Sequence, residues 1–257
     1  LETYHNYTLL HDDLMDDAPL RRGQQTVHVC WDANTAILSG DSMLVLAFER
    51  MAQCDSRHLS EVLRLFTVTA LEIGEGQQYD MEFENRNDVK EEEYIEMIRL
   101  KTSVLLACAM KIGAILADAP AEDVENLYKF GEQIGLAFQL QDDYLDVYGD
   151  PKVFGKKIGG DIICNKKTYM LINAFNKANA RQCKELEKWI GCENFNHEEK
   201  VAAVTELYNS IGVDKMAIER INYYFDEANK YIAAVNLPDE RKAELLAYAQ
   251  KMLHRKW

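Results

Sequence analysis

The chain has 257 residues, of which 28% are charged, and its formal net charge is −14. This length suffices for one large domain with a substantial core, and no shift in composition indicates a second domain. The excess of acidic residues argues against nucleic acid or an anionic membrane surface as a partner. The six cysteines form no C-x-x-C pair and lack metal-ligand spacing, which is typical of reduced thiols in the cytoplasm. No apolar run is long enough to span a membrane, and no signal peptide is recognisable.

Apolar residues recur every three to four positions through almost the whole chain, which predicts an all-helical protein. The four prolines fall where other residues also indicate a break. Asp88 is the predicted N-cap of the helix that follows it, because its carboxylate can accept from the first backbone amides. Helices are predicted over residues 1–17, 31–52, 57–84, 89–118, 121–148, 166–190, 197–209, 212–236 and 239–254.

Several apolar side chains of these helices are expected in the core. They include Leu38 and Val45 in the second helix, where Gly40 suggests a close contact with another helix. Three tyrosines late in the chain are expected in the core as well, namely Tyr223, Tyr224 and Tyr231.

Two acidic clusters share one spacing, DDLMD at residues 12–16 and DDYLD at residues 142–146. Carboxylates at positions i and i+4 project from one face of a helix, so the outer aspartates of each cluster can hold a cation. Oxygen ligands without nearby cysteine or paired histidine favour Mg²⁺ over zinc. Mg²⁺ usually completes its coordination with water and substrate phosphates. The sequence therefore predicts a diphosphate substrate.

A single cluster of this kind is more often a solvated acidic face, and it is the second copy that favours a metal site. Fixed positive charge also follows each cluster, with Arg21 and Arg22 after the first and Lys156 and Lys157 after the second. These side chains can supply the positive charge that a metal-bound diphosphate requires.

With Arg21-Arg22-Gly23 behind the first cluster and Gln139-Leu140-Gln141 ahead of the second, the chain resembles the trans-isoprenyl diphosphate synthases over roughly residues 1–236. This family includes the farnesyl and geranylgeranyl diphosphate synthases. The resemblance implies an all-α, single-domain helical bundle of the isoprenoid synthase type around a central cavity, with a polyprenyl synthetase domain over residues 1–257. It also implies a Mg²⁺-dependent prenyltransferase, generally a homodimer. Such an enzyme condenses isopentenyl diphosphate with dimethylallyl, geranyl or farnesyl diphosphate to give farnesyl or geranylgeranyl diphosphate.

The same resemblance implies roles for individual charged residues. Mg²⁺ is held by Asp12, Asp16 and Asp142. The allylic diphosphate is bound by Arg21, Lys101 and one lysine of the pair Lys156-Lys157, of which Lys156 is favoured by its spacing. Taken alone, Lys101 among leucines and valines could instead extend its ammonium group from an apolar helix face to solvent.

Further residues are assigned by the same resemblance to the carbon chemistry and to the second substrate. The allylic cation is surrounded by Thr102, Gln139 and Phe138, because their hydroxyl, carbonyl and ring faces stabilise positive charge without being good nucleophiles. Isopentenyl diphosphate is held by His5 and Arg22, with a weaker indication for Arg255. Gln77 and Asp80 either face the active cavity or lie at the edge of a glycine-permitted helix crossing.

Product length is expected to depend on the helix before the first cluster. Tyr7 lies five residues before Asp12, about 7.5 Å along a helix, and Tyr4 lies one turn further. Thr8 is small where many animal-type farnesyl synthases have a second aromatic residue. The pattern predicts a C15 to C20 product and does not separate the two lengths.

Family members usually carry several dozen residues before this point, including a Gly-Gly-Lys-Arg-like stretch that helps to bind isopentenyl diphosphate. Here the first cluster follows Leu1 after only eleven residues. Three interpretations stay open: a fragment, preceding residues that were disordered or cleaved, or a divergent protein without the usual isopentenyl diphosphate site. A class I terpene cyclase is disfavoured because it usually replaces the second cluster with an Asn/Ser/Glu-type triad. A non-catalytic subunit of a heteromeric synthase is disfavoured because both clusters are complete.

Overall fold

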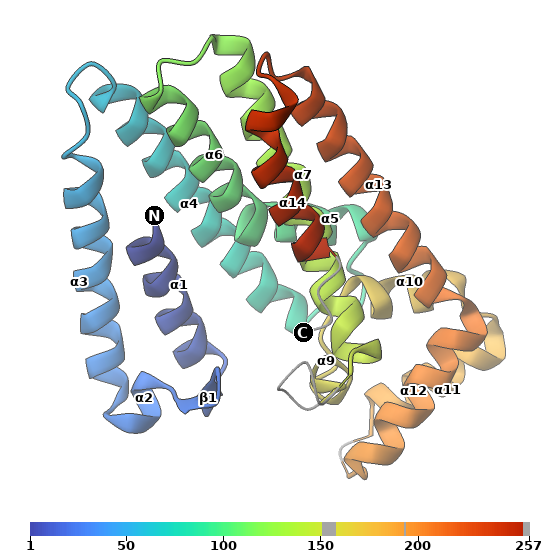
Figure 1. Cartoon of the computed structure of the whole chain (residues 1–257). Helices are drawn as coiled ribbons and strands as arrows, with labels where there is room; N and C mark the ends of the chain where they lie inside the picture. Colours follow the sequence, from blue (N-terminus) through green and yellow to red (C-terminus); the bar gives the residue numbers. More distant parts are fainter. Residues whose placement is uncertain (151–157, 193, 254–257) are drawn as a thin grey trace. The chain divides into compact units, whose positions relative to one another are not determined.

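The structure is a computed structural model that describes residues 1–150, 158–192 and 194–253. The chain divides into two compact units, and each is described by itself. The first unit contains Leu1–Val68 and Ile112–Ala119, and the second contains Thr69–Lys111 and the chain from Pro120 onward. Figure 1 shows that nearly all of the regular structure is helical. Among the described residues, no helix is both long and apolar enough to cross a membrane.

The first unit is built on α1 (Glu2–Met15) and α3 (Ala33–Met51), which pack side by side (Figure 1). The predicted close contact at Gly40 is confirmed, because a β-carbon there would overlap the ring of His11 on α1. The unit also contains α2 (Val27–Cys30), the part of α4 (Leu59–Glu84) up to Val68, and the end of α6 (Val104–Leu116).

The residues that follow the first acidic cluster form a β-hairpin with a two-residue turn. Strand β1 (Leu20–Arg21) pairs antiparallel with β2 (Gln24–Gln25), with Arg21 opposite Gln24. Arg22 and Gly23 between them both have positive φ angles, 53° and 76°. Two left-handed residues give the turn whose twist matches that of paired strands. The hairpin directs the chain back, so that Arg21 reaches the end of α1.

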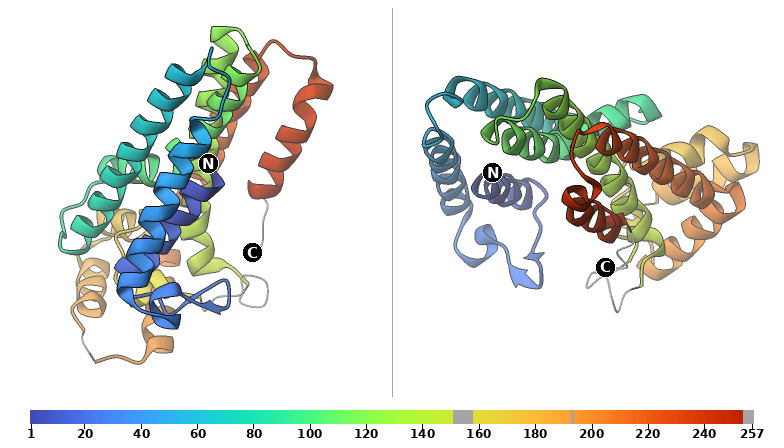
Figure 2. Two further views of the ribbon diagram at one scale, coloured as in Figure 1. Left: turned by 90° about the vertical axis from the view of Figure 1, so that its left-hand side faces the viewer. Right: turned by 45° about the horizontal axis from the view of Figure 1, so that its top comes forward.

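The second unit contains the rest of α4, and α5 (Glu91–Ile98), a π-helical turn η1 (Arg99–Ser103) and the start of α6. The central helix is α7 (Ala121–Tyr148), which packs along α13 (Val213–Ala234). The left view of Figure 2 shows α13 and α14 (Asp239–Leu253) as a helical hairpin. The remaining helices of this unit are α9 (Gly160–Ile163), α10 (Tyr169–Lys177), α11 (Ala180–Ile190) and α12 (His197–Ile211).

Several predicted helix boundaries are wrong for local reasons. Helix α5 begins after Lys90 and not after Asp88, because the Asp88 carboxylate instead accepts a hydrogen bond from Arg86 at 2.9 Å. The predicted helix 166–190 is two helices, because the Asn179 side chain accepts from the amides of Arg181 and Gln182 and starts α11.

The predicted core is wrong at several positions. Leu38 and Val45 on α3 are 66% and 67% exposed, and Tyr223 on α13 is exposed as well. Tyr224 is buried, and Tyr231 is partly buried against the core, as predicted. Helical periodicity identifies an apolar face correctly but does not say whether that face is covered within the same chain.

Candidate active site

The first acidic cluster lies at the end of α1, and its middle aspartate is bound by the hairpin. Asp13 is only 7% exposed. The Nε of Arg21 donates to both carboxylate oxygens of Asp13 at 2.8 Å, and a terminal nitrogen lies 2.7 Å from Oδ1. The same guanidinium is 3.5 Å from Oδ2 of Asp12. Asp12 is partly buried and Asp16 is exposed, and they stand one turn apart.

The residues before this cluster form a row of aromatic contacts along α1. The ring of Tyr7 lies 5.4 Å from that of Tyr4 and 4.8 Å from that of His11, measured between centroids. Tyr4 is 2% exposed and packs edge-on against Phe66. The aromatic contacts of α1 are therefore continuous from His11 to Tyr4, and Tyr4 is buried in the first unit.

The other residues predicted in this unit have local partners. The Thr8 hydroxyl donates to the backbone oxygen of His5 at 2.8 Å. Nδ1 of His5 lies 3.7 Å from the Glu2 carboxylate. Arg22 is exposed at the tip of the hairpin, adjacent in sequence to the Arg21 that binds Asp13.

The second acidic cluster lies near the end of α7 and repeats the arrangement of the first. Asp143, its middle aspartate, is 4% exposed. Its Oδ2 accepts from the hydroxyl of Tyr94 and from the backbone N–H of Tyr169, the latter at 3.3 Å. Oδ1 accepts from Nε2 of Gln139, also at 3.3 Å. Asp142 and Asp146 are partly buried one turn apart. Thus in both clusters the protein itself binds the middle carboxylate.

Negative charge is concentrated around this second cluster. The backbone N–H of Asp161, on α9, donates to Oδ2 of Asp146 at 3.0 Å, which brings a fourth carboxyl group near the three on α7. Burial raises the pKa of Asp143, and repulsion from Asp142 adds to the effect. Burial and the charges of Asp146 and Asp143 likewise raise the pKa of Asp161. Ionising all of these groups is costly unless a cation compensates them.

The donor chemistry of both clusters fits a hard divalent cation. Each offers two carboxylates at i and i+4, and Mg²⁺ is typically bound by one or two carboxylates plus phosphate oxygens and water. Among the described residues, no three His, Cys, Asp or Glu side chains are grouped to hold a metal by themselves. A metal at either cluster would accordingly take further ligands from substrate or solvent.

Lys101 lies on the π-helical turn and is paired with Asp80. Its Nζ is 2.7 Å from Oδ2 of Asp80, and Nζ of Lys166 is 3.6 Å from the same oxygen. Burial opposes ionisation of Asp80, but the two lysines outweigh it and hold the pKa of Asp80 below its ordinary value. Sequence reasoning missed Lys166. The available signal was a Lys-Lys-Thr stretch shortly after the glycines at 159 and 160. The predicted residues Lys156, Lys157 and Arg255 lie outside the described residues.

Thr102 and Gln139, both predicted beside the allylic cation, are hydrogen-bonded to each other and linked to the second cluster. The Thr102 hydroxyl donates to Oε1 of Gln139 at 3.1 Å, and Gln139 in turn donates to Asp143. A chain of hydrogen bonds thus runs from the π-helical turn to the buried aspartate. This network fixes the Gln139 amide between a hydroxyl and a carboxylate.

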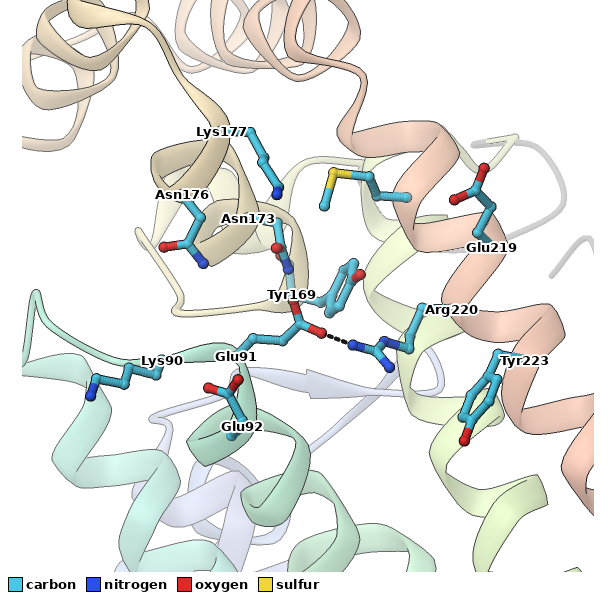
Figure 3. A pocket seen from close by; sticks show the side chains of 11 residues that line it. Lys90, Glu91, Glu92, Tyr169, Asn173, Asn176, Lys177, Glu219, Arg220 and Tyr223 are labelled. Atoms are coloured by element: carbon cyan, nitrogen blue, oxygen red, sulfur yellow. Dashed lines mark hydrogen bonds and ion pairs between the residues drawn. The ribbon is translucent and has the colours of Figure 1, made fainter.

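A cavity of about 740 Å³ lies elsewhere in the second unit, between the start of α5, α10 and α13 (Figure 3). Glu91 and Arg220 form an ion pair across it. The side chain of Tyr169 lines the cavity, while its backbone N–H is the donor to Asp143. None of the site residues predicted from the sequence is among its described lining residues.

The fold is all-α, one helix of each unit carries an aspartate pair, and the charge of Lys166 acts on Asp143 of the second cluster. This combination is typical of the isoprenoid synthases, the class of the structural neighbours. The chain belongs to the polyprenyl synthetase family, whose family model matches residues 1–208. The family and the all-α fold predicted from the sequence are both confirmed.

Individual relatives agree with this assignment. The short chain isoprenyl diphosphate synthase of Methanocaldococcus jannaschii is 43% identical over 212 residues, which are 82% of this chain and 64% of that protein. A crystal structure of a geranylgeranyl pyrophosphate synthase superposes with a TM-score of 0.94 at 42% identity, covering 100% of this chain and 79% of the other. The Corynebacterium glutamicum geranylgeranyl pyrophosphate synthase, solved with isoprenyl diphosphate and magnesium, has a TM-score of 0.88 at 28% identity and covers 99% and 77%.

Proposed function

We propose that the chain is a short-chain trans-prenyltransferase that joins isopentenyl diphosphate to an allylic diphosphate and forms farnesyl or geranylgeranyl diphosphate. One observation carries the proposal. In both clusters the middle aspartate is buried and bound by protein donors, and the two outer aspartates stand one turn apart, where carboxylates at i and i+4 can share a cation. The reaction class is supported by the names of two relatives, short chain isoprenyl diphosphate synthase and geranylgeranyl pyrophosphate synthase.

We assign Mg²⁺ binding to Asp12, Asp16 and Asp142. The assignment is supported by the all-oxygen donor set and by the raised pKa of Asp143 and Asp161, which burial causes and the repulsion between neighbouring carboxylates increases. The magnesium in the Corynebacterium glutamicum neighbour supports it further. When bound, Mg²⁺ supplies positive charge that stabilises a departing diphosphate.

The allylic diphosphate is bound, in this proposal, by Arg21, Lys101 and Lys156. Arg21 has five N–H donors and can contact a phosphate oxygen while it keeps a bond to Asp13. Asp80 accepts a hydrogen bond from the Lys101 ammonium at 2.7 Å, and this ion pair positions the proposed diphosphate ligand. Lys166, beside the same carboxylate, joins this group.

Loss of diphosphate leaves an allylic cation, and the residues proposed to surround it are Thr102, Gln139 and Phe138. Because the Thr102 proton is donated to Gln139, the hydroxyl oxygen can present a lone pair to positive charge. Isopentenyl diphosphate, held by His5 and Arg22, then attacks the allylic cation through its double bond, and the carbocation that results loses a proton to the released diphosphate. Tyr7, Thr8 and Tyr4 form the proposed floor that limits the chain length of the product.

A homodimer is proposed from the exposed apolar residues of two helices. Leu38 and Val45 on α3, with Val68 and Leu71 on α4, are all exposed large hydrophobic side chains. Exposed large apolar side chains are characteristic of protein interfaces. The chain is further proposed to act as one polyprenyl synthetase domain. Its six unpaired cysteines are consistent with a cytoplasmic location.

Product analysis tests the proposal. The protein is incubated with labelled isopentenyl diphosphate and geranyl or farnesyl diphosphate, with Mg²⁺ and with excess chelator. The expected result is Mg²⁺-dependent formation of C15 or C20 prenyl diphosphates, identified after dephosphorylation by chromatography. Cyclic hydrocarbons from farnesyl diphosphate alone would point to a terpene cyclase, and no turnover of any allylic substrate would contradict the proposed activity.

A further inference from the structure

Two of the residues proposed to contact the allylic substrate, Lys101 and Thr102, lie on the π-helical turn η1, which interrupts an otherwise continuous helix. The backbone N–H of Val104 donates to the oxygen of Arg99, five residues earlier, and the Ser103 hydroxyl donates to the oxygen of Ile98 at 3.5 Å. Isolated π-helical turns are less stable than α-helix and persist where surrounding contacts hold them. The contacts around Lys101 and Thr102 therefore decide where these two residues lie.

On one side, the backbone of Lys101 lies directly against Gly76 of α4. A β-carbon on Gly76 would overlap the Lys101 nitrogen and come within 2.8 Å of its Cα and of the Leu100 carbonyl carbon. These are backbone atoms, so no side-chain rotation could make room. One turn further along α4, Asp80 binds the Lys101 ammonium.

On the other side, the same arrangement recurs on α7. A β-carbon on Gly135 would lie 2.5 Å from the Cα of Ser103 and 2.7 Å from its Cβ. One turn further along α7, Gln139 accepts the hydrogen bond of Thr102. Each flanking helix thus has a glycine against the backbone of the turn and, four residues later, a polar side chain that binds a side chain of the turn.

We propose that Gly76 and Gly135 are positioning residues that set the location of the Lys101–Thr102 backbone, acting as a two-glycine clamp. The clamp consists of Gly76 with Asp80 and Gly135 with Gln139. It rests on the proposed function, because its effect on catalysis requires Lys101 and Thr102 to face the allylic diphosphate. A methyl group at either glycine displaces the turn away from that helix and separates Lys101 from Asp80 or Thr102 from Gln139.

The test compares Gly76→Ala and Gly135→Ala with Gly131→Ala as a matched control. Gly131 is a glycine of the same kind on α7, where a β-carbon would lie 2.8 Å from the Cα of Ala107, outside the π-helical turn. All three variants are expected to lower the melting temperature. At a temperature where circular dichroism shows them folded, the two clamp variants lose at least tenfold in kcat/KM for the allylic diphosphate. Their KM for isopentenyl diphosphate stays within twofold of wild type, and the control keeps both constants within twofold.

Hydrogen exchange gives a second measurement that does not depend on activity. Amides of residues 99–104 should exchange at least tenfold faster in Gly76→Ala and Gly135→Ala than in wild type, and within twofold of wild type in Gly131→Ala. If Gly135→Ala does not fold, the combination with Ser103→Gly removes the side-chain part of the overlap and is measured in its place.

Unchanged exchange of residues 99–104 in the folded clamp variants overturns the clamp, whatever the activity. Wild-type kcat/KM in those variants, or an equal loss in Gly131→Ala, also overturns it. An inactive wild-type protein whose clamp variants show the faster exchange contradicts the proposed function and leaves the clamp supported as a structural device.

Discussion

The hydroxyl of Tyr94 on α5 donates a hydrogen bond to Oδ2 of Asp143, the buried middle aspartate of the second cluster on α7. This bond connects the element that leads into the π-helical turn with the helix that carries Asp142, one of the proposed metal ligands. Together with the hydrogen bonds from Tyr169 and Gln139, it occupies the carboxylate oxygens of Asp143. This explains why Asp143 is not proposed as a metal ligand.

Removing this hydroxyl is expected to destabilise the protein. Tyr94→Phe keeps the ring but leaves a buried carboxylate oxygen with one donor fewer, which should lower the free energy of unfolding by about 1–3 kcal/mol. Tyr79→Phe on α4, where the side chain is exposed, should change it by less than about 0.5 kcal/mol. Urea unfolding of both variants measures the difference, and equal values would show that the Tyr94 bond contributes nothing.

Removing an outer aspartate is expected to abolish turnover without unfolding the protein. Asp12→Ala and Asp142→Ala should each lower kcat by orders of magnitude while the helical circular dichroism stays nearly unchanged, because these carboxylates hold ions and not the core. Asp17→Ala, at an exposed position just past the cluster, is the matched control and should retain activity. Wild-type turnover in excess chelator would refute the role in metal binding.

The ion pairs of Asp80 predict a specific pH dependence of stability. The folded-state pKa of Asp80 is below its ordinary value, so its ionic contribution is present above that ordinary value and is lost as the pH falls through the folded-state pKa. Asp80→Asn should therefore be less stable than wild type at pH 7, with the difference shrinking below about pH 4. Denaturant unfolding of both proteins between pH 7 and pH 3 tests this, and a pH-independent difference would contradict it.

Removing the ring of Tyr7 from the proposed floor should lengthen the product. In Tyr7→Ala the ring five residues before Asp12 is removed, about 7.5 Å along the helix, so the growing chain can extend toward Tyr4. Tyr4 is buried against Phe66 and should act as the next stop. Chromatography of dephosphorylated products measures the shift relative to wild type. An unchanged chain-length distribution would mean that the floor is formed by other residues.

Charging the exposed face of α3 should separate the proposed dimer. Leu38→Glu combined with Val45→Glu replaces two exposed apolar side chains with carboxylates. Because both positions are exposed, the fold should persist, while self-association is lost. Light scattering at micromolar concentration is expected to show a dimer for wild type and a monomer for the variant. Leu237→Glu, at an exposed leucine between α13 and α14, is the control. A monomeric wild type would contradict the proposed assembly.

Sequence reasoning predicted the helices and the acidic clusters because both depend on local spacing. A carboxylate pair at i and i+4 has the same geometry on any helix, and α7 begins and ends where the prediction placed it. The Asp88 cap was wrong because a neighbouring arginine competes for the same carboxylate. Lys166 was missed because its role depends on an ion pair with Asp80, far away in the sequence.

The π-helical turn could not be predicted from the sequence for a different reason. Residues 99–103 have no unusual propensity, and what holds them is the close approach of Gly76 and Gly135 from two other helices. The exposure of Leu38 is a similar case, since periodicity describes one helix and says nothing of what packs against it.

The π-helical turn also has a consequence for helical phase. Relative to an uninterrupted α-helix, its extra residue rotates everything that follows by roughly 100° about the axis. A helical-wheel projection continued from α5 through α6 would therefore place the side chains of α6, such as Cys108, about one residue out of phase. If residues 99–103 formed regular α-helix with no residue removed, α6 would turn by about the same angle, and its side that lies against Gly131 of α7 would no longer meet that helix. A one-residue deletion, by contrast, would remove the π-helical turn and leave α6 in its present phase. The extra residue of the turn thus determines which side of α6 is buried.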